Sequence, residues 1–202
     1  MKSLRFVVAG GLMLVAGAGV ALAPRHVEVV ESAPALAAAF KVDNVHSAVI
    51  FRISHNEVGT FFGRFNEISG SFLLDSADTA GSSIDVSVNL EKVDTANERR
   101  DNHLRSPDFF NTALNKTATF KSKTISSTGD GAFTITGDFT MMGVTKPVTA
   151  QITKAKSKSG NRGELAGFEA IFTIKRSEYG MTKFADSLGD DVTIMIGMEG
   201  TR

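Results

Sequence analysis

Apolar and polar residues alternate through most of the chain beyond residue 47. In the segment 82–90, SSIDVSVNL, every second residue from Ile84 onward is apolar. Successive side chains of an extended strand point to opposite faces, so a period of two indicates strands with one buried and one hydrated face. The chain is therefore expected to be all-β. The same alternation recurs in the segments 47–56, 61–75, 117–127, 132–141, 147–156, 165–175 and 191–199.

The connections between these segments favour a closed sheet. The sequences TGDGA at 128–132 and KSKSGNRGE at 156–164 are rich in Gly and polar residues, as hairpin turns are. About eight strands joined mostly by short loops form an antiparallel meander, and closing it into a barrel removes the exposed edges. We predict an eight-stranded antiparallel barrel, which can be filled with side chains or can hold one small ligand. A two-sheet sandwich is the alternative.

The segment 61–75 changes the face on which its apolar residues lie. Phe61 and Phe65 share one parity, whereas Ile68 and Phe72 follow with the other. An extra residue in one strand restores the apolar face and bends the strand, and barrel corners use such devices. We therefore expect a β-bulge near Asn66-Glu67.

Residues 1–39 are expected to be a signal peptide, or an uncleaved anchor followed by a spacer. Lys2 and Arg5 precede a run of apolar residues and Gly at 6–23, which is typical of an export signal. A run of that length can also just span a bilayer. Both interpretations place residues 40–202 outside the cytoplasm, in the periplasm or secreted. Candidate cleavage sites follow Ala23, Ala37 and Ala39.

Composition excludes several classes of function. The chain has no Cys, which rules out disulfides, cysteine nucleophiles and thiolate metal sites. Its 22 basic and 22 acidic residues balance, whereas a nucleic-acid-binding protein needs an excess of positive charge. The separations of His46, His55 and His103 match no metal-ligand motif, and no catalytic or nucleotide-binding fingerprint is present. We expect neither a metal nor a nucleic acid as partner.

The segment 95–110, TANERRDNHLRSPDFF, holds the densest set of reactive groups. Thr95 and Glu98 have the spacing of a helix-capping box, and Ser106-Pro107 suits the start of a second helical turn. We therefore predict a short helical excursion around residues 95–112. An enzymatic alternative, a hydrolase or isomerase, would use His103 with Asp101 or Asp108.

The large apolar residues are unusual in kind. The chain has 15 Phe and 7 Met but one Tyr and no Trp. Phe and Met offer large surfaces that need no hydrogen bond, so they can line a pocket for an apolar chain as well as form an ordinary core.

Several motifs together resemble one family. They are FKVDNVHSAVIFRISH at 40–55, GRFNEISGSFLLD at 63–75, VDTANERRDNHLRSPDFF at 93–110, TATFKS at 117–122, GDFTMMGVTKPV at 137–148, FTIKRSEYGM at 172–181 and LGDDVTI at 188–194. In this order they resemble the YceI-like family of exported lipocalin-like barrels, which are associated with polyisoprenoid or other long-chain lipids. The family often has Leu-His-Gly where this chain has Met141-Met142-Gly143, so a headgroup contact from that histidine would be absent.

The resemblance implies an eight-stranded antiparallel lipocalin-like β-barrel whose cavity holds an isoprenoid or fatty chain, without catalysis or a cofactor. A homodimer is compatible with such a barrel. A ligand-free structural or stress-response barrel remains an alternative. Leu104, with Phe109 and Phe110, is expected to cover one end of the barrel. The predicted lipid contacts are Phe51, Ile53, Phe61, Phe65, Phe72, Phe109, Phe110, Phe120, Phe139, Phe168, Phe172 and Ile194, and His55, Arg64 and Arg105 are the predicted headgroup contacts.

Overall fold

The computed structural model describes residues 38–161 and 163–202. The predicted signal peptide or anchor lies almost wholly outside these residues and stays a prediction. Among the described residues, no helix is long and apolar enough to cross a bilayer. The elements are β1 (Phe40–Val42), β2 (Ala48–His55), β3 (Gly59–Phe65), β4 (Ile68–Leu73), β5 (Ser83–Asn89), η1 (Leu90–Lys92), β6 (Val93–Asp94), α1 (Glu98–Arg105), β7 (Thr117–Gly129), β8 (Ala132–Met141), β9 (Val144–Gly160), β10 (Gly163–Lys175), η2 (Arg176–Tyr179) and β11 (Leu188–Thr201).

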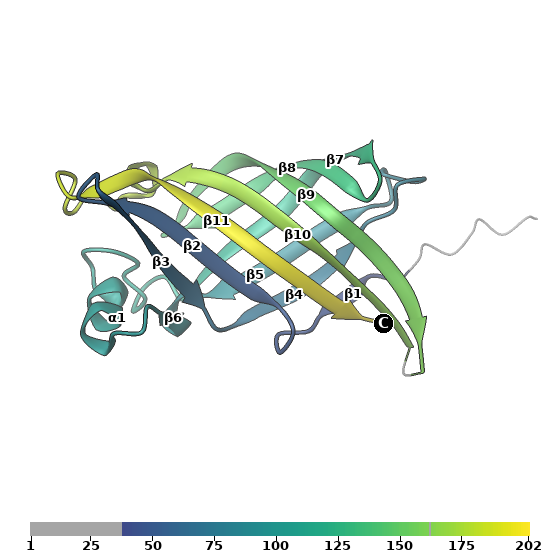
Figure 1. Cartoon of the computed structure of the whole chain (residues 1–202), viewed down its shortest axis with the longest axis horizontal. Helices are drawn as coiled ribbons and strands as arrows, with labels where there is room; N and C mark the ends of the chain where they lie inside the picture. The colour runs from purple at the N-terminus through teal and green to yellow at the C-terminus, as the bar shows by residue number, and fades with distance from the viewer. Residues whose placement is uncertain (1–37, 162) are drawn as a thin grey trace, which may run out of the picture. The chain divides into compact units, whose positions relative to one another are not determined.

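The strands form one closed antiparallel sheet (Figure 1). Their order is β1-β4-β5-β7-β8-β9-β10-β11-β2-β3-β6, and β1 also pairs with β11, which closes the ring. Because β1 and β2 are two parts of one interrupted strand, as are β3 and β4, and also β5 and β6, the wall has eight strands. The predicted barrel is confirmed, and the two-sheet sandwich is wrong.

The expected bulge at Asn66-Glu67 is a break between two strands instead. The strand β3 ends at Phe65, where it pairs with β2, and β4 begins at Ile68, where it pairs with β5. The two residues of the break bond to neighbouring segments, since the Asn66 amide donates to the Lys92 carbonyl and the Glu67 carbonyl accepts from the Asn89 amide. The change of apolar parity is therefore real, but it marks a corner at which the chain changes partners.

One end of the barrel is filled by aromatic rings. Phe72 is 2% exposed, and its ring centroid lies 5.6 Å from that of Phe40 and 5.0 Å from that of Phe168. The loops between β4 and β5, β7 and β8, and β9 and β10 lie at this end, as does the C-terminus (Figure 1). We call it the closed end.

The predicted helical excursion is present, but its details differ from the prediction. The helix α1 is capped by Asn97, whose side chain accepts a hydrogen bond from the Arg100 amide. Thr95 does not cap the helix, because its hydroxyl oxygen accepts from the Arg100 guanidinium and its hydroxyl proton is donated to the buried carboxylate of Asp101. The expected second helical turn after Ser106 consists of hydrogen-bonded turns. The capping box is therefore wrong, and α1 starts later than it implied.

Candidate functional site

The barrel encloses an apolar cavity of about 540 Å³. Its wall consists mainly of inward side chains of β2 to β5 and β7 to β11, and nearly all of them are aliphatic or aromatic. This volume lies in the range typical of small-molecule sites, which are mostly apolar with a few polar groups. The interior can therefore take up an apolar molecule without leaving polar protein groups unpaired.

The cavity reaches solvent at the end opposite the closed end. The exposed residues in its lining all belong to three neighbouring segments: the hairpin between β2 and β3, the helix α1, and the loop 180–187. We call this end the mouth. Figure 1 shows α1 and the loop before β11 at the same end of the barrel. The exposed lining residues are His55, Gly59, Thr60, Arg100, His103 and Phe184.

All but one of the predicted apolar contacts line this cavity. The exception is Phe72, which shares the inward face but lies beyond the cavity in the ring stack of the closed end. Leu104 also lines the cavity, as the lid prediction requires. The residues that line it are Phe51, Ile53, Phe61, Phe65, Phe109, Phe110, Phe120, Phe139, Phe168, Phe172 and Ile194. Their contact with a lipid stays a prediction.

The predicted headgroup contacts are divided by the structure. His55 lines the mouth. Arg64 is exposed and does not line the cavity, because it follows the inward-facing Gly63 in β3 and has the opposite parity. Arg105 is also outside the lining, since its guanidinium donates to the carbonyls of Glu91 and Val93. Two of the three polar predictions therefore fall on residues that hold the scaffold or face solvent.

Arg176 is a cavity-lining residue that sequence reasoning missed. It is 4% exposed, and its guanidinium donates to the carbonyls of Met181, Lys183, Leu188 and Gly189 at 2.6, 2.8, 3.0 and 2.9 Å. These carbonyls belong to the loop at the mouth and to the start of β11. One buried side chain therefore fixes the conformation of this loop and places a positive charge beside the cavity.

A second cation missed by the sequence analysis is Arg100 of α1. Its guanidinium lies 4.3 Å from the ring centroid of Phe61, and it donates to the hydroxyl and carbonyl of Thr95 at 2.8 and 2.7 Å. Arginine over an aromatic face is a favourable cation–π contact. The contact with Phe61 ties the helix to β3, and the Arg100–Thr95–Asp101 network fixes the turn that leads into it.

An aromatic bridge joins the α1 segment to the loop 180–187. The ring of Phe184 stacks on that of Phe109 at 6.2 Å, and His103 meets both rings edge-on at 5.2 and 5.8 Å. Phe184 has a positive φ of 57° and is 48% exposed, so it is held at the surface of the mouth. These contacts connect the two segments across the mouth. We call His103, Phe109 and Phe184, together with their two segments, the lid.

The charged groups beside this bridge are paired with one another. The imidazole Nε2 of His103 lies 3.0 Å from the Asp108 carboxylate, whose other oxygen lies 3.6 Å from the Lys183 amine. The hydrogen bond with His103 and the charge of Lys183 hold the pKa of Asp108 below its ordinary value. Asp108 therefore stays ionised and links the two halves of the lid.

Only part of the geometry that the enzymatic alternative requires is present in the structure. His103 pairs with Asp108 and not with Asp101, whose carboxylate accepts from the amide and hydroxyl of Thr95. Over 38–161 and 163–202, no hydroxyl group is hydrogen-bonded to the His103 imidazole. Activation of a nucleophile needs such a contact between nucleophile and base. The exposed His103–Asp108 pair is explained by its place in the lid.

Met142 occupies the place of the histidine that the family often has. It forms a two-residue turn with Gly143 between β8 and β9, and both residues have positive φ, at 52° and 74°. Met141 lines the cavity, whereas Met142 does not. At this position the chain therefore supplies no polar side chain to the cavity.

Comparison with known proteins agrees with this architecture. Residues 40–200 match the YceI-like domain. The protein named YceI of Escherichia coli is 38% identical over 173 residues, which cover 83% of this chain and 89% of that protein. The crystal structure of the YceI protein of Campylobacter jejuni has a TM-score of 0.61 and 30% identity, over 69% of this chain and 84% of that one.

A more distant structure shares the fold. A domain from Saccharophagus degradans, described as a polyisoprenoid-binding domain implicated in plant cell wall breakdown, has a TM-score of 0.60 at 15% identity. The match covers 81% of this chain and 99% of that domain. The match of residues 40–200 and the identity to the E. coli protein are decisive for the family. This chain belongs to the YceI-like family.

Proposed function

We propose that this protein binds and carries a long-chain apolar lipid, with a polyisoprenoid as the leading candidate, in the barrel cavity. The observation that carries the proposal is the apolar cavity of about 540 Å³. Packed side chains bound it at the closed end, and it reaches solvent at the mouth. A chain would enter with its apolar part toward Phe168 and its polar end toward the mouth. The polyisoprenoid-binding description of the Saccharophagus degradans domain, which shares the fold, supports this choice of ligand.

Burial of the lipid chain supplies the driving force. Each methylene removed from water contributes about 0.8 kcal/mol, so a ten-carbon chain gains roughly 8 kcal/mol before ordering costs are subtracted. The cavity wall needs no hydrogen bonds from such a ligand. His55, Arg100 and Arg176 at the mouth are the side chains that would meet a polar or anionic end group. We place this activity outside the cytoplasm, on the basis of the signal expected in residues 1–39.

Native mass spectrometry of protein purified from its own host tests the proposal. We expect a reproducible adduct that organic extraction releases as an isoprenoid or fatty-chain lipid. Delipidated protein should then bind added geranylgeraniol and solanesol. Protein that never carries an adduct and binds neither alcohol would contradict the proposal and favour the ligand-free barrel.

A matched pair of variants locates the ligand. Ala150 is 5% exposed and lines the cavity, whereas Ala48 is exposed on β2 and lies outside it. Ala150→Phe should fill part of the cavity and weaken geranylgeraniol binding by at least about tenfold, since several buried methylenes are lost. Ala48→Phe adds the same ring outside and should leave binding unchanged. Equal binding by both variants would place the lipid elsewhere.

A further inference from the structure

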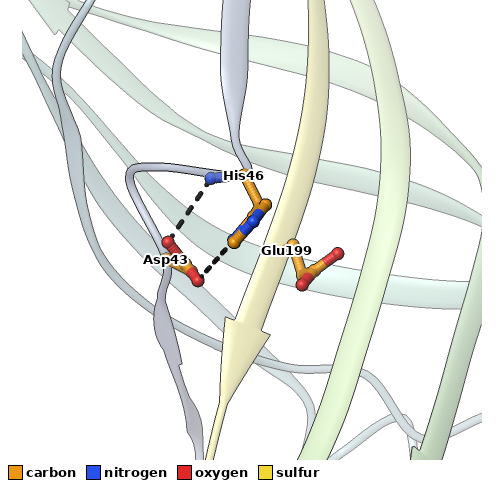
Figure 2. A group of neighbouring side chains, drawn as sticks. All are labelled: Asp43, His46 and Glu199. Atoms are coloured by element: carbon orange, nitrogen blue, oxygen red, sulfur yellow. Dashed lines mark hydrogen bonds and ion pairs between the residues drawn. The ribbon is translucent and has the colours of Figure 1, made fainter.

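The seam where the barrel closes carries a group of polar side chains that the lipid cavity does not use. Along this seam β11 changes partner, from β2 at the Gly197–Ala48 pair to β1 at the Gly200–Val42 pair. The turn 43–47 lies between these two pairings. Asp43, His46 and Glu199 meet at this point, and the atoms that they can offer to a metal all lie within 4.8 Å of one another (Figure 2).

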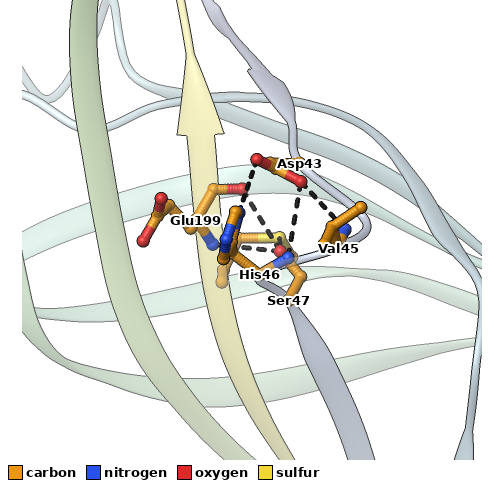
Figure 3. Close-up of polar contacts among 6 residues, drawn as sticks. Asp43, Val45, His46, Ser47 and Glu199 are labelled. Atoms are coloured by element: carbon orange, nitrogen blue, oxygen red, sulfur yellow. Dashed lines mark hydrogen bonds and ion pairs between the residues drawn. The ribbon is translucent and has the colours of Figure 1, made fainter.

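The backbone holds the two halves of this group together. The amide of Asp43 donates to the Glu199 carbonyl at 2.9 Å, and the Ser47 hydroxyl donates to the same carbonyl at 3.2 Å. The Glu199 amide in turn donates to the Ser47 hydroxyl at 3.0 Å (Figure 3). These bonds fix the position of β11 against the turn, although the segments lie far apart in the sequence.

The turn itself is also ordered by its own side chains. The Oδ1 atom of Asp43 accepts from the amides of Val45 and His46, at 2.8 and 3.4 Å. The Asn44 side chain accepts from the Ile68 amide at 2.7 Å, which anchors the turn to β4. The Oδ2 atom of Asp43 therefore remains directed at the Nδ1 atom of His46, 2.8 Å away. Two atoms that can coordinate a metal ion are therefore oriented before any ion binds.

The charges of this group favour a cation. Within the described part of the chain, neither Asp43 nor Glu199 forms an ion pair with Lys or Arg. Among residues 38–161 and 163–202, the only basic group that contacts them is the imidazole of His46, whose side chain is 62% exposed. Two carboxylates therefore share one weakly basic partner at a site that solvent ions can reach.

We propose that Asp43, His46 and Glu199 bind a divalent transition-metal ion, with Zn²⁺ as the best fit. One imidazole and two carboxylates form a nitrogen–oxygen donor set that suits Zn²⁺ better than the all-oxygen preference of Mg²⁺ or Ca²⁺. Tetrahedral Zn²⁺ with bonds near 2.1 Å places its donors roughly 3.4 Å apart. The present separations, from 2.8 Å to within 4.8 Å, bracket this value, so small side-chain rotations complete the site. Water fills the remaining position.

Such an ion would act on the barrel and not on the cavity. None of the three residues lines the cavity, and the mouth lies at the other end of β2, roughly 23 Å along the strand from Ala48 to His55. A bound ion would link the turn after β1 to β11 and so reinforce the closure of the sheet. An ion that binds the folded chain raises its stability through mass action.

Isothermal titration of the untagged full chain with ZnCl₂ tests this site. We expect one Zn²⁺ per chain and a higher midpoint of thermal unfolding in the presence of zinc. His46→Ala and Glu199→Gln should each weaken binding by at least about tenfold and abolish the thermal shift, since each removes a ligand. MgCl₂ should bind far more weakly than ZnCl₂.

Matched variants separate this site from other zinc-binding groups. His26→Ala removes a histidine outside the described residues, and Glu57→Gln removes an exposed carboxylate of the β2–β3 hairpin. Both should leave the affinity for Zn²⁺ unchanged. Circular dichroism should show that every variant is folded. Absence of zinc binding, or binding that survives either His46→Ala or Glu199→Gln, would overturn the three-residue site. Lipid binding is measured separately, so failure here leaves the proposed carrier function untouched.

Discussion

The two ends of the barrel are built from the same strands but differ in packing: the interior is filled at one end and open at the other. At the closed end, the rings of Phe40 and Phe72 fill the interior, and Phe168 packs against Phe72 where the cavity begins. At the mouth, aromatic rings are combined with His103, Arg100 and the buried Arg176, and space remains beneath them. The comparison shows that the alternation of a strand decides which face points inward, while local packing decides whether the interior is full.

The largest effect on stability is expected at the closed end. Phe72→Ala should lower the free energy of unfolding by about 3–5 kcal/mol, because it leaves a cavity in a packed ring cluster. The lipid affinity should change little, since Phe72 does not line the cavity. Urea unfolding and geranylgeraniol titration measure the two quantities. A large loss of affinity at unchanged stability would show that the ligand extends into the closed end.

At the mouth, Arg176 should have the next largest effect. Arg176→Met keeps much of the side-chain volume but leaves four backbone carbonyls without their donor. We expect a loss of about 2–3 kcal/mol of unfolding free energy, since each unpaired buried group is costly. Unlike Phe72→Ala, this variant should also speed lipid dissociation, because the loop 180–187 loses its anchor. Stopped-flow release of a fluorescent prenyl alcohol measures that rate. An unchanged rate would show that the loop 180–187 does not control lipid release.

The lid is tested by adding charge to its apolar face. Phe109→Asp should raise the rate of lipid dissociation by about tenfold or more, because it removes an apolar contact and the stack on Phe184. Arg99→Ala, at an exposed position of the preceding helix α1, is the matched control and should have no effect. If both variants release lipid at the wild-type rate, the chain enters by another route.

The smallest effect concerns the pH dependence of the lid. Because the folded pKa of Asp108 lies below its ordinary value of 3.8, its pairing stabilises the folded state above that pH. This contribution is lost as the pH falls through the lowered folded pKa. Asp108→Asn should therefore lower the urea midpoint at about pH 7, and the difference from wild type should shrink as the pH falls below about 4. A difference that stays constant with pH would show that Asp108 acts without its charge.

Much of the fold could be read from the alternation of apolar residues. It predicted the strands and their inward faces, and so identified the wall of the cavity from Phe51 to Ile194. It could not distinguish Phe72 from Phe168, because both face inward and only their depth in the barrel differs. Depth depends on how neighbouring strands are staggered, which is a relation between distant segments.

The polar groups were harder to predict because their roles depend on partners. Thr95 has the spacing of a helix cap, but its hydroxyl oxygen accepts from the Arg100 guanidinium instead of from a helix amide, and its hydroxyl proton is donated to Asp101. Arg176 carries no sequence signal of burial, since its partners are backbone carbonyls of a loop that only the folded chain brings together. Arg64 and Arg105 were predicted as headgroup contacts because they are charged, although neither lines the cavity.

The sequence by itself determined an all-β chain whose period of two places one face of every strand inward, because alternation is a local property of extended backbone. The tertiary structure alone decided where the interior is filled, which cations stand at the mouth, and that Asp43 and His46 meet Glu199 at the seam. These features arise where segments distant in sequence become neighbours through strand pairing. That pairing is set by closure of the whole sheet.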